Sequence, residues 1–289
     1  MSAATETPTR ARASHQPLPP SRLRFSGVLK SEWIKLTTLR STVWAYLIVV
    51  LLQIGMAALF ALTVNMGTTG PGGPGAPGGG AEAAVTGAAA TQTAVLTASL
   101  GVMLGQLVVS VLGVLVISGE YGTGQIRSTF TAVPKRLPVL WGKALVFAVS
   151  TFVVGLIAVF AAYAVTWGML DARGVTSDIT DPDVWGRLVG AAGYLVLVGL
   201  IAYFLGAILR VTAGGIAAAV GLVLVVPIVL GFVNAEWASV LGQWLPSSAG
   251  QTLFLGGGVF EPWQAVLVML GWIAVFATTA AVLLKRRDA

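Results

Sequence analysis

The sequence predicts an all-α membrane protein with six transmembrane helices, and three observations support this fold class. Apolar residues make up 56% of the 289-residue chain and charged residues only 10%, with a mean hydropathy of +0.87. Soluble domains carry about a quarter charged residues, so this composition is typical of a chain solvated by lipid. Six stretches have the ~20 apolar residues that a helix needs to cross a bilayer, and none contains Asp, Glu, Lys or Arg between its ends.

The six predicted spans are spread along the chain from residue 43 onward. They cover residues 43–64, 94–117, 145–169, 188–209, 213–233 and 265–284. Each is expected to be a helix, because a bilayer offers no water to pair exposed backbone groups. The ~10-residue alternating segments of a β-barrel are absent from the sequence. Pro227 removes one backbone hydrogen bond from the fifth span and predicts a kink there.

The region before the first span divides into two parts. Residues 1–24 are polar and rich in proline, which predicts a disordered cytoplasmic tail rather than a signal peptide. Residues 25–41 predict an amphipathic elbow helix in the membrane interface, with a simple juxtamembrane anchor as the alternative. Glu32 falls inside the apolar stripe of this helix, where a carboxylate needs a partner. The candidate elbow residues are Lys30, Glu32, Trp33, Lys35 and Arg40.

The loop between the second and third spans is longer than a connection between adjacent helices requires, which is about 2–8 residues. Thr123 can cap a short helix that Pro134 would end. We therefore expect an ordered, charged helix on the cytoplasmic side that docks a partner protein. The candidate docking residues are Glu120, Tyr121, Gly122, Thr123, Ile126 and Arg127.

Three further segments lie between or after the spans. Residues 67–80 read GTTGPGGPGAPGGG and predict a flexible external linker. Residues 234–263 contain three tryptophans, which suit the membrane interface, and a short interfacial or re-entrant helix fits them. Residues 285–289 form a basic cytoplasmic tail.

The distribution of charge predicts that both termini are cytoplasmic. Every Lys and Arg except Arg173 and Arg187 falls on the segments that this orientation places inside, as the positive-inside rule requires. Most acidic residues fall outside, namely Glu82, Asp171, Asp178, Asp181, Asp183, Glu236 and Glu261. The net charge of +6 is therefore attributed to topology and contact with anionic lipids, and no nucleic-acid partner is expected.

No recognisable catalytic motif is present, so the chain is predicted not to be an enzyme and to need no cofactor. It has no Cys, and its one His is His15 in the polar tail. Gly142-Lys143 lacks the glycine spacing and the following Ser or Thr of a phosphate-binding loop. The uncharged spans offer no carboxylate for ion coupling, so the energy for any transport must come from another subunit.

Two short patterns resemble the permease subunits of type-2 ABC transporters, in the form found in actinobacterial members. The first is Glu120-x-Gly122-Thr123 with Ile126-Arg127, Pro134, Arg136 and Gly142-Lys143. The second is Lys30-Ser31-Glu32-Trp33-x-Lys35 with Thr38-x-Arg40-Ser41, which resembles the elbow helix of these subunits. The resemblance covers nearly the whole chain, although the insert at residues 67–80 is unusual for the family.

The resemblance implies a non-catalytic permease subunit of an ATP-driven exporter in the plasma membrane. Such subunits pair as a homodimer or heterodimer with a second permease and bind separate ABC ATPase subunits, which hold the ATP. Residues 120–136 would be the coupling helix, with Arg127 facing the ATPase. One alternative is a membrane-anchored regulatory or assembly protein without a transport path. Another is a lipid-modifying enzyme that uses Asp178, Asp181 and Asp183.

Overall fold

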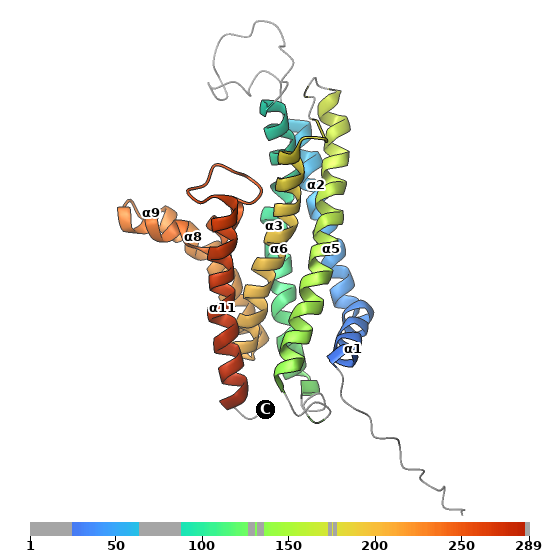
Figure 1. Cartoon of the computed structure of the whole chain (residues 1–289), viewed down its shortest axis with the longest axis vertical. Coiled ribbons are helices and arrows are strands. Elements are labelled where there is room, and N and C mark those ends of the chain that lie inside the picture. The colour runs from blue at the N-terminus through green and yellow to red at the C-terminus, as the bar shows by residue number, and fades with distance from the viewer. Residues whose placement is uncertain are drawn as a thin grey trace, which may run out of the picture.

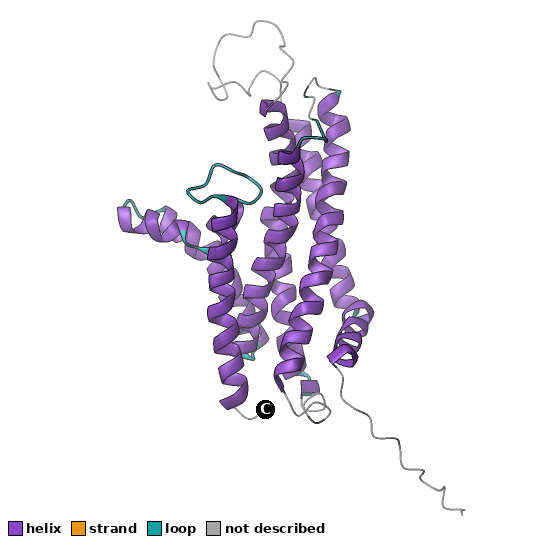
Figure 2. Cartoon of the chain, viewed as in Figure 1, coloured by secondary structure: helices purple, strands orange, loops and turns teal. Residues whose placement is uncertain are grey.

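The computed structural model describes residues 25–63, 88–126, 131, 136–172, 175 and 178–286, and its regular elements are helices without a β-strand in these ranges (Figures 1 and 2). The predicted tail 1–24, linker 67–80 and residues 287–289 lie outside the described residues. Six helical runs are long and apolar enough to cross a membrane: α2 (Arg40–Thr63), α3 (Ala88–Gly122), α5 (Arg136–Asp171), α6 (Pro182–Leu209), Thr212–Gly231 and α11 (Pro262–Arg286). The all-α, six-span prediction is confirmed, and it indicates a multi-pass membrane protein.

Two of the helices are much longer than the apolar spans predicted for them. α3 has 35 residues and α5 has 36, which corresponds to about 53 Å at ~1.5 Å per residue. A hydrocarbon core is only ~30 Å thick, so both helices continue into polar sequence. Glu120 belongs to the end of α3 and Lys143 to the beginning of α5. Hydropathy locates the apolar part of such a helix but not its ends.

α3 and α6 form the centre of the bundle. They bury the largest share of their apolar length, and α2, α5 and α11 pack around them. The two central helices approach closely at a pair of glycines, where a Cβ atom on Gly113 would lie 2.5 Å from the backbone oxygen of Gly199. Polar side chains also join the helices: Gln53 of α2 donates to the backbone oxygen of Ala98 in α3 at 2.5 Å. Tyr194 of α6 donates to Gln106 of α3.

The fifth span is interrupted near the predicted proline. It consists of α7 (Thr212–Val220), the π-helical turn η1 (Gly221–Val225) and α8 (Val226–Gly231). The N–H of Val226 donates to the backbone oxygen of Gly221, five residues earlier. Pro227 has no N–H to donate, and its ring crowds the preceding turn. The fifth span is therefore distorted near Pro227, and the distortion is the wider π-helical turn just before this proline.

The segment between the fifth and sixth spans folds into two short helices rather than a loop. They are α9 (Glu236–Gln243) and α10 (Pro246–Gln251), followed by a turn in which Gly256 and Gly257 have positive φ. α10 packs against α6 and α11, and the indole of Trp272 in α11 donates to the backbone oxygen of Trp244 at 2.9 Å. Figure 1 shows α9 partway along the long helices, not beyond their ends. Short helices are therefore observed in this segment, and their interfacial or re-entrant position in a membrane stays a prediction.

Charged residues separate along the bundle. We call "the α1 end" the end formed by α1 (Phe25–Thr38), the C-terminal ends of α3, α6 and α11, and the N-terminal end of α5 (Figure 1). Every described Lys and Arg except Arg187 lies at this end. Two of them reach the end of α11: Arg136 donates to the backbone oxygen of Leu284 at 3.3 Å, and Arg210 to that of Leu283 at 3.5 Å.

Candidate functional site

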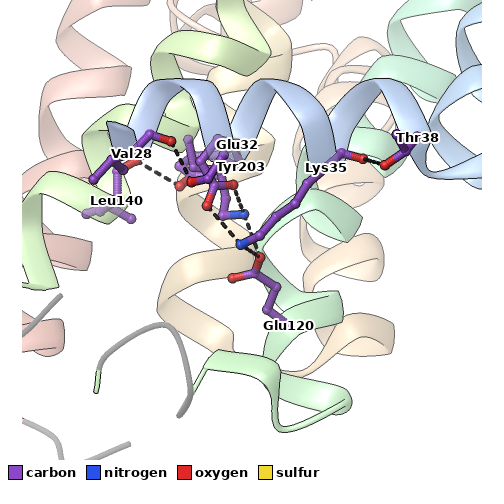
Figure 3. A network of polar contacts seen from close by, with 9 residues as sticks. Val28, Glu32, Lys35, Thr38, Glu120, Leu140 and Tyr203 are labelled. Carbon is purple, nitrogen blue, oxygen red and sulfur yellow. Dashed lines mark hydrogen bonds and ion pairs between the residues drawn. The ribbon is translucent and has the colours of Figure 1, made fainter. Parts of the chain in front are cut away.

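Four charged side chains from three helices meet at the α1 end (Figure 3). We call them the ion-pair network: Glu32 and Lys35 of α1, Glu120 of α3 and Lys143 of α5. Lys143 Nζ lies 2.5 Å from Glu32 Oε2 and 2.8 Å from Glu120 Oε1. Lys35 Nζ lies 3.0 Å from Glu32 Oε1 and 3.1 Å from Glu120 Oε1. Each lysine thus bridges both carboxylates, and the formal charges balance.

The network is largely withdrawn from solvent. The side chains of Glu32, Lys143 and Glu120 are 3%, 4% and 9% exposed, and that of Lys35 is 29% exposed. Removing a charge from water is costly unless it is paired and hydrogen-bonded. Glu32 meets this condition with both oxygens, whereas Oε2 of Glu120 is buried and has no hydrogen-bond partner among the described residues. One acceptor of the network therefore remains unused.

The backbone brings the network together through close packing of α1 on α5. Val28, Glu32 and Leu36 are the buried residues of α1, and their spacing of four residues places them on one helix face. A Cβ atom on Gly142 would lie 3.1 Å from Val28 Cγ1. The absence of a side chain at Gly142 therefore allows α1 to approach α5 beside Lys143. The Gly142-Lys143 pair has a packing and charge-pairing role in this structure.

Lys35 keeps its charge within this network. Burial lowers the pKa of Lys35, but the hydrogen bond to Glu32 and the charges of Glu120 and Glu32 raise it by more. The pKa of Lys35 therefore lies above its ordinary value of 10.5. At neutral pH this lysine is protonated and holds α1 to the end of α3.

The candidate elbow residues separate into two groups. Glu32 and Lys35 enter the network, and the partner that Glu32 required is found in both lysines. Lys30, Trp33 and Arg40 are exposed. The helix predicted for residues 25–41 begins at Phe25 as expected but ends at Thr38, and Leu39 separates it from α2. Its position relative to a membrane interface stays a prediction.

The candidate docking residues occupy the end of α3 and the loop that follows. Glu120, Tyr121 and Gly122 form the end of α3, and the Tyr121 ring lies 5.1 Å from the Arg210 guanidinium. The Thr123 hydroxyl donates to the backbone oxygen of Gly119 at 3.0 Å, within the last turn of α3. Ile126 is buried. Arg127 and Pro134 lie outside the described residues, so the coupling helix stays a prediction.

Lys143 was not expected in this site. It precedes the predicted third span by two residues and so falls among the basic residues expected on the cytoplasmic side, where a lysine is normally solvated. The structure instead buries it inside a continuous α5. The sequence signal was the isolated carboxylate in the apolar stripe of residues 25–41, which called for a basic partner without identifying it.

A cavity of about 460 Å³ lies beside the network. All four network residues line it, together with apolar residues of α1, α3 and α5 that include Leu36, Leu112 and Val146. Leu39 and Leu115 also line it and are 54% and 37% exposed, so the cavity opens toward the outside of the bundle.

The acidic loop considered for a lipid-modifying enzyme uses its carboxylates locally. Asp178 accepts hydrogen bonds from the backbone N–H and hydroxyl of Thr180, and Asp181 caps α6 by accepting from the N–H of Asp183. The described part of the chain has no group of three or more His, Cys, Asp or Glu that could hold a metal ion. These hydrogen bonds are typical of a turn that leads into the N-terminus of a helix, here α6.

Comparisons with known proteins assign the chain to no family. No protein-family model matches it, and no curated protein matches it.

Proposed function

We propose that this chain is the permease subunit of an ATP-driven exporter of the ABC type-2 kind in the plasma membrane. The observation that carries the proposal is the ion-pair network, which joins α1, α3 and α5 directly beside the loop between α3 and α5. Glu120 lies only a few residues before that loop. A force applied to the loop would therefore reach three helices together.

The proposed mechanism places the chemistry in partner subunits. Separate ATPase subunits bind ATP, close on each other and press on residues 123–135. The network transmits this displacement to α1 and α5, and the bundle changes between inward- and outward-facing states as a population shift. This chain supplies the transport path and the network that transmits the displacement, and the catalytic groups belong to the ATPase subunits.

The orientation follows from charge. The α1 end holds every described Lys and Arg except Arg187, and basic residues favour the cytoplasmic side of a membrane. This charge supports an orientation in which the network, both termini and the loop after α3 face the cytoplasm, where an ATPase can reach them. α1 then lies at the inner surface as the elbow helix.

A second permease copy, identical or related, completes the proposed assembly. The run Thr212–Gly231, α11 and α2 bury the smallest shares of their apolar length within the chain. Their exposed apolar faces are covered either by lipid or by the second permease.

The proposal is tested by purifying the full chain from its native membranes in a mild detergent and identifying bound proteins by mass spectrometry. We expect an ABC ATPase to co-purify. After reconstitution with it, Arg127→Ala is expected to lower chain-stimulated ATP hydrolysis about tenfold, since a charge-assisted contact is worth on the order of 1.4 kcal/mol or more.

The matched control is Arg286→Ala, which removes an exposed arginine at the same end of the bundle but outside the loop. It should leave the stimulated rate unchanged. If no ATPase co-purifies, the chain is better explained as a membrane-anchored regulatory or assembly protein. Equal rates for the two variants would contradict the docking role of Arg127.

A further inference from the structure

A groove of about 790 Å³ runs along the outward side of α11. Its α11 side includes Gln264, Gly271 and Val275, and its other wall consists of Trp244 and Phe260, which precede this helix. We call it the α11 groove. None of the described residues that line it is charged, and Gln264 contributes the one amide side chain. An occupant that fits this lining is uncharged and apolar over most of its length.

The groove is shaped by a hydrogen bond, an aromatic contact and a missing side chain. The Trp272 indole donates to the backbone oxygen of Trp244 at 2.9 Å, which ties α11 to the end of α9. The Trp244 and Phe260 rings meet edge to face, with their centroids 5.0 Å apart. Nothing from other parts of the chain lies within 4 Å of the place where a Cβ atom of Gly271 would stand. The groove is therefore open at Gly271 and has a defined shape before an occupant enters.

The position of the groove along α11 corresponds to one half of a bilayer. Val275 follows Gln264 by eleven residues, which is about 16 Å at ~1.5 Å per residue. Lys285 follows Val275 by ten residues, about another 15 Å. Together these lengths match a hydrocarbon core of ~30 Å. The α11 groove thus extends from the membrane surface opposite the α1 end to the middle of the bilayer.

This depth distinguishes between two occupants of an apolar groove. A spanning helix of a second copy crosses the whole ~30 Å core, so the groove that receives it should continue past Val275. An acyl chain extends from one membrane surface to the bilayer centre, which is the depth observed. The outer end also suits a lipid, because Trp263 is 63% exposed beside Gln264 and tryptophan favours the level of the head groups. An acyl chain in the groove restores the dispersion contacts that its lining would lack if it were empty.

We propose that the α11 groove binds one acyl chain of a phospholipid from the leaflet opposite the α1 end. The ester end of the chain lies beside Gln264 and the methyl end beside Val275. The lining offers no charged group to a head group, so the site recognises the hydrocarbon chain. This inference is independent of the transport function and of the ion-pair network, since the groove lies on another face of the bundle.

Photo-labelling of the full chain tests the inference. The chain is reconstituted in phosphatidylcholine vesicles that contain phosphatidylcholine with a diazirine either at the end of one acyl chain or near its ester, and labelled residues are identified by tandem mass spectrometry. We expect the terminal probe to label residues 271–275 and the ester-side probe to label residues 260–264. The reverse order would assign the chain to the other leaflet and overturn the proposal.

A lipid-facing residue outside the groove gives the reference level. Leu51 lies in the middle of α2, is 59% exposed and does not line the groove. The terminal probe should label residues 271–275 about fivefold more than Leu51, which corresponds to ~1 kcal/mol of preference. Equal labelling would reduce the groove to ordinary contact with bulk lipid and overturn the proposal.

A pair of matched variants locates the site. Gly271→Trp fills the groove and should lower labelling of residues 272–275 to the level at Leu51. Val282→Trp is the control, because Val282 lies on the same face of α11 about three turns away, is 47% exposed and does not line the groove. Val275→Trp repeats the test should Gly271→Trp fail to fold. Labelling that persists when the groove is filled would contradict the assignment.

Occupation of the groove by a second copy is tested separately. The chain has no native cysteine, so Gly271→Cys carries a single thiol inside the groove. Oxidation of this variant with copper phenanthroline in its native membranes should give no disulfide-linked dimer. A dimer would place a second copy at the groove and overturn the assignment to a lipid.

Discussion

Glu32 is a carboxylate in the middle of a helix face that packs against other helices, and both of its oxygens are engaged by lysines. Removing one member of such a network leaves a buried charge without compensation, which is more costly than the net contribution of the pair. Lys143 is the critical member, because it is almost fully buried and contacts both carboxylates. Lys35 is partly exposed, so water can replace part of its contacts with the carboxylates when its side chain is removed.

We expect Lys143→Ala to lower the free energy of unfolding by about 3–5 kcal/mol, because two buried carboxylates would then share only Lys35. Unfolding in mixed micelles of a mild detergent and SDS measures this change. The double variant Glu32→Gln, Lys143→Met should lose less than the sum of the single variants, since it removes opposite charges together. Lys285→Ala, at an exposed residue, is the control, and a similar loss there would argue against a stabilising network.

The raised pKa of Lys35 has a defined sign for stability. A basic group whose folded pKa exceeds its unfolded value contributes its full stabilisation below the unfolded value, here about 10.5. The contribution is lost only as pH rises through the higher folded pKa. The attachment of α1 by Lys35 is therefore insensitive to pH changes near neutrality.

At the scale of elements, the contact between α1 and α5 depends on a missing side chain. Phe25, Val28 and Leu29 of α1 all lie within 4 Å of the place where a Cβ atom of Gly142 would stand. A larger residue at this position would separate the helices and lengthen the distance between Glu32 and Lys143. Among the described helices, α1 packs mainly on α5 and α2, and its ion pair from Lys35 to Glu120 reaches α3.

We expect Gly142→Leu to detach α1 from the bundle. The chain has no native cysteine, so Leu36→Cys, at a buried position of α1, provides a single reporter. Its reaction with a maleimide in detergent should be at least fivefold faster in the Gly142→Leu background, since detachment exposes the thiol. Gly168→Leu is the control on the same helix, because nothing lies near its Cβ position. Equal reaction rates in both backgrounds would show that α1 is held by other contacts.

At the scale of the whole molecule, the two ends of the bundle carry opposite kinds of charge. The α1 end is rich in Lys and Arg, and Asp178, Asp181 and Asp183 lie near the beginning of α6 at the opposite end. Charge at the ends of spans determines how a chain inserts into a membrane. The proposed orientation therefore depends on the molecule as a whole and not on any one loop.

Membrane topology is expected to follow this charge difference. Asp178→Cys should react with a membrane-impermeant maleimide in intact cells, whereas Lys285→Cys should react only after the membrane is opened. Both positions are exposed, so burial does not account for a difference between them. The reverse pattern would invert the orientation and remove the loop after α3 from cytoplasmic partners.

The sequence predicts the spans but not the network, because a span depends on neighbouring residues whereas the network depends on residues far apart in the sequence. An apolar stretch is a local property, so all six spans could be located from composition alone. The first residue of α5, Arg136, and the last residue of α3, Gly122, lie outside the apolar stretches. Polar residues continue the helices there, so hydropathy does not locate these ends. The pairing of Glu32 with Lys143 joins residues 111 positions apart and requires three helices to be placed first. The sequence indicated only that Glu32 needed a partner.

α11 is attached near both of its extremities. Arg136 and Arg210 hold the backbone oxygens of Leu284 and Leu283 at one extremity, and near the other Ala265 and Met269 are fully buried. Most of the apolar length of the helix nevertheless faces outward. The sixth span is therefore suited to present a fixed apolar surface, because neither extremity is free to swing away from the bundle.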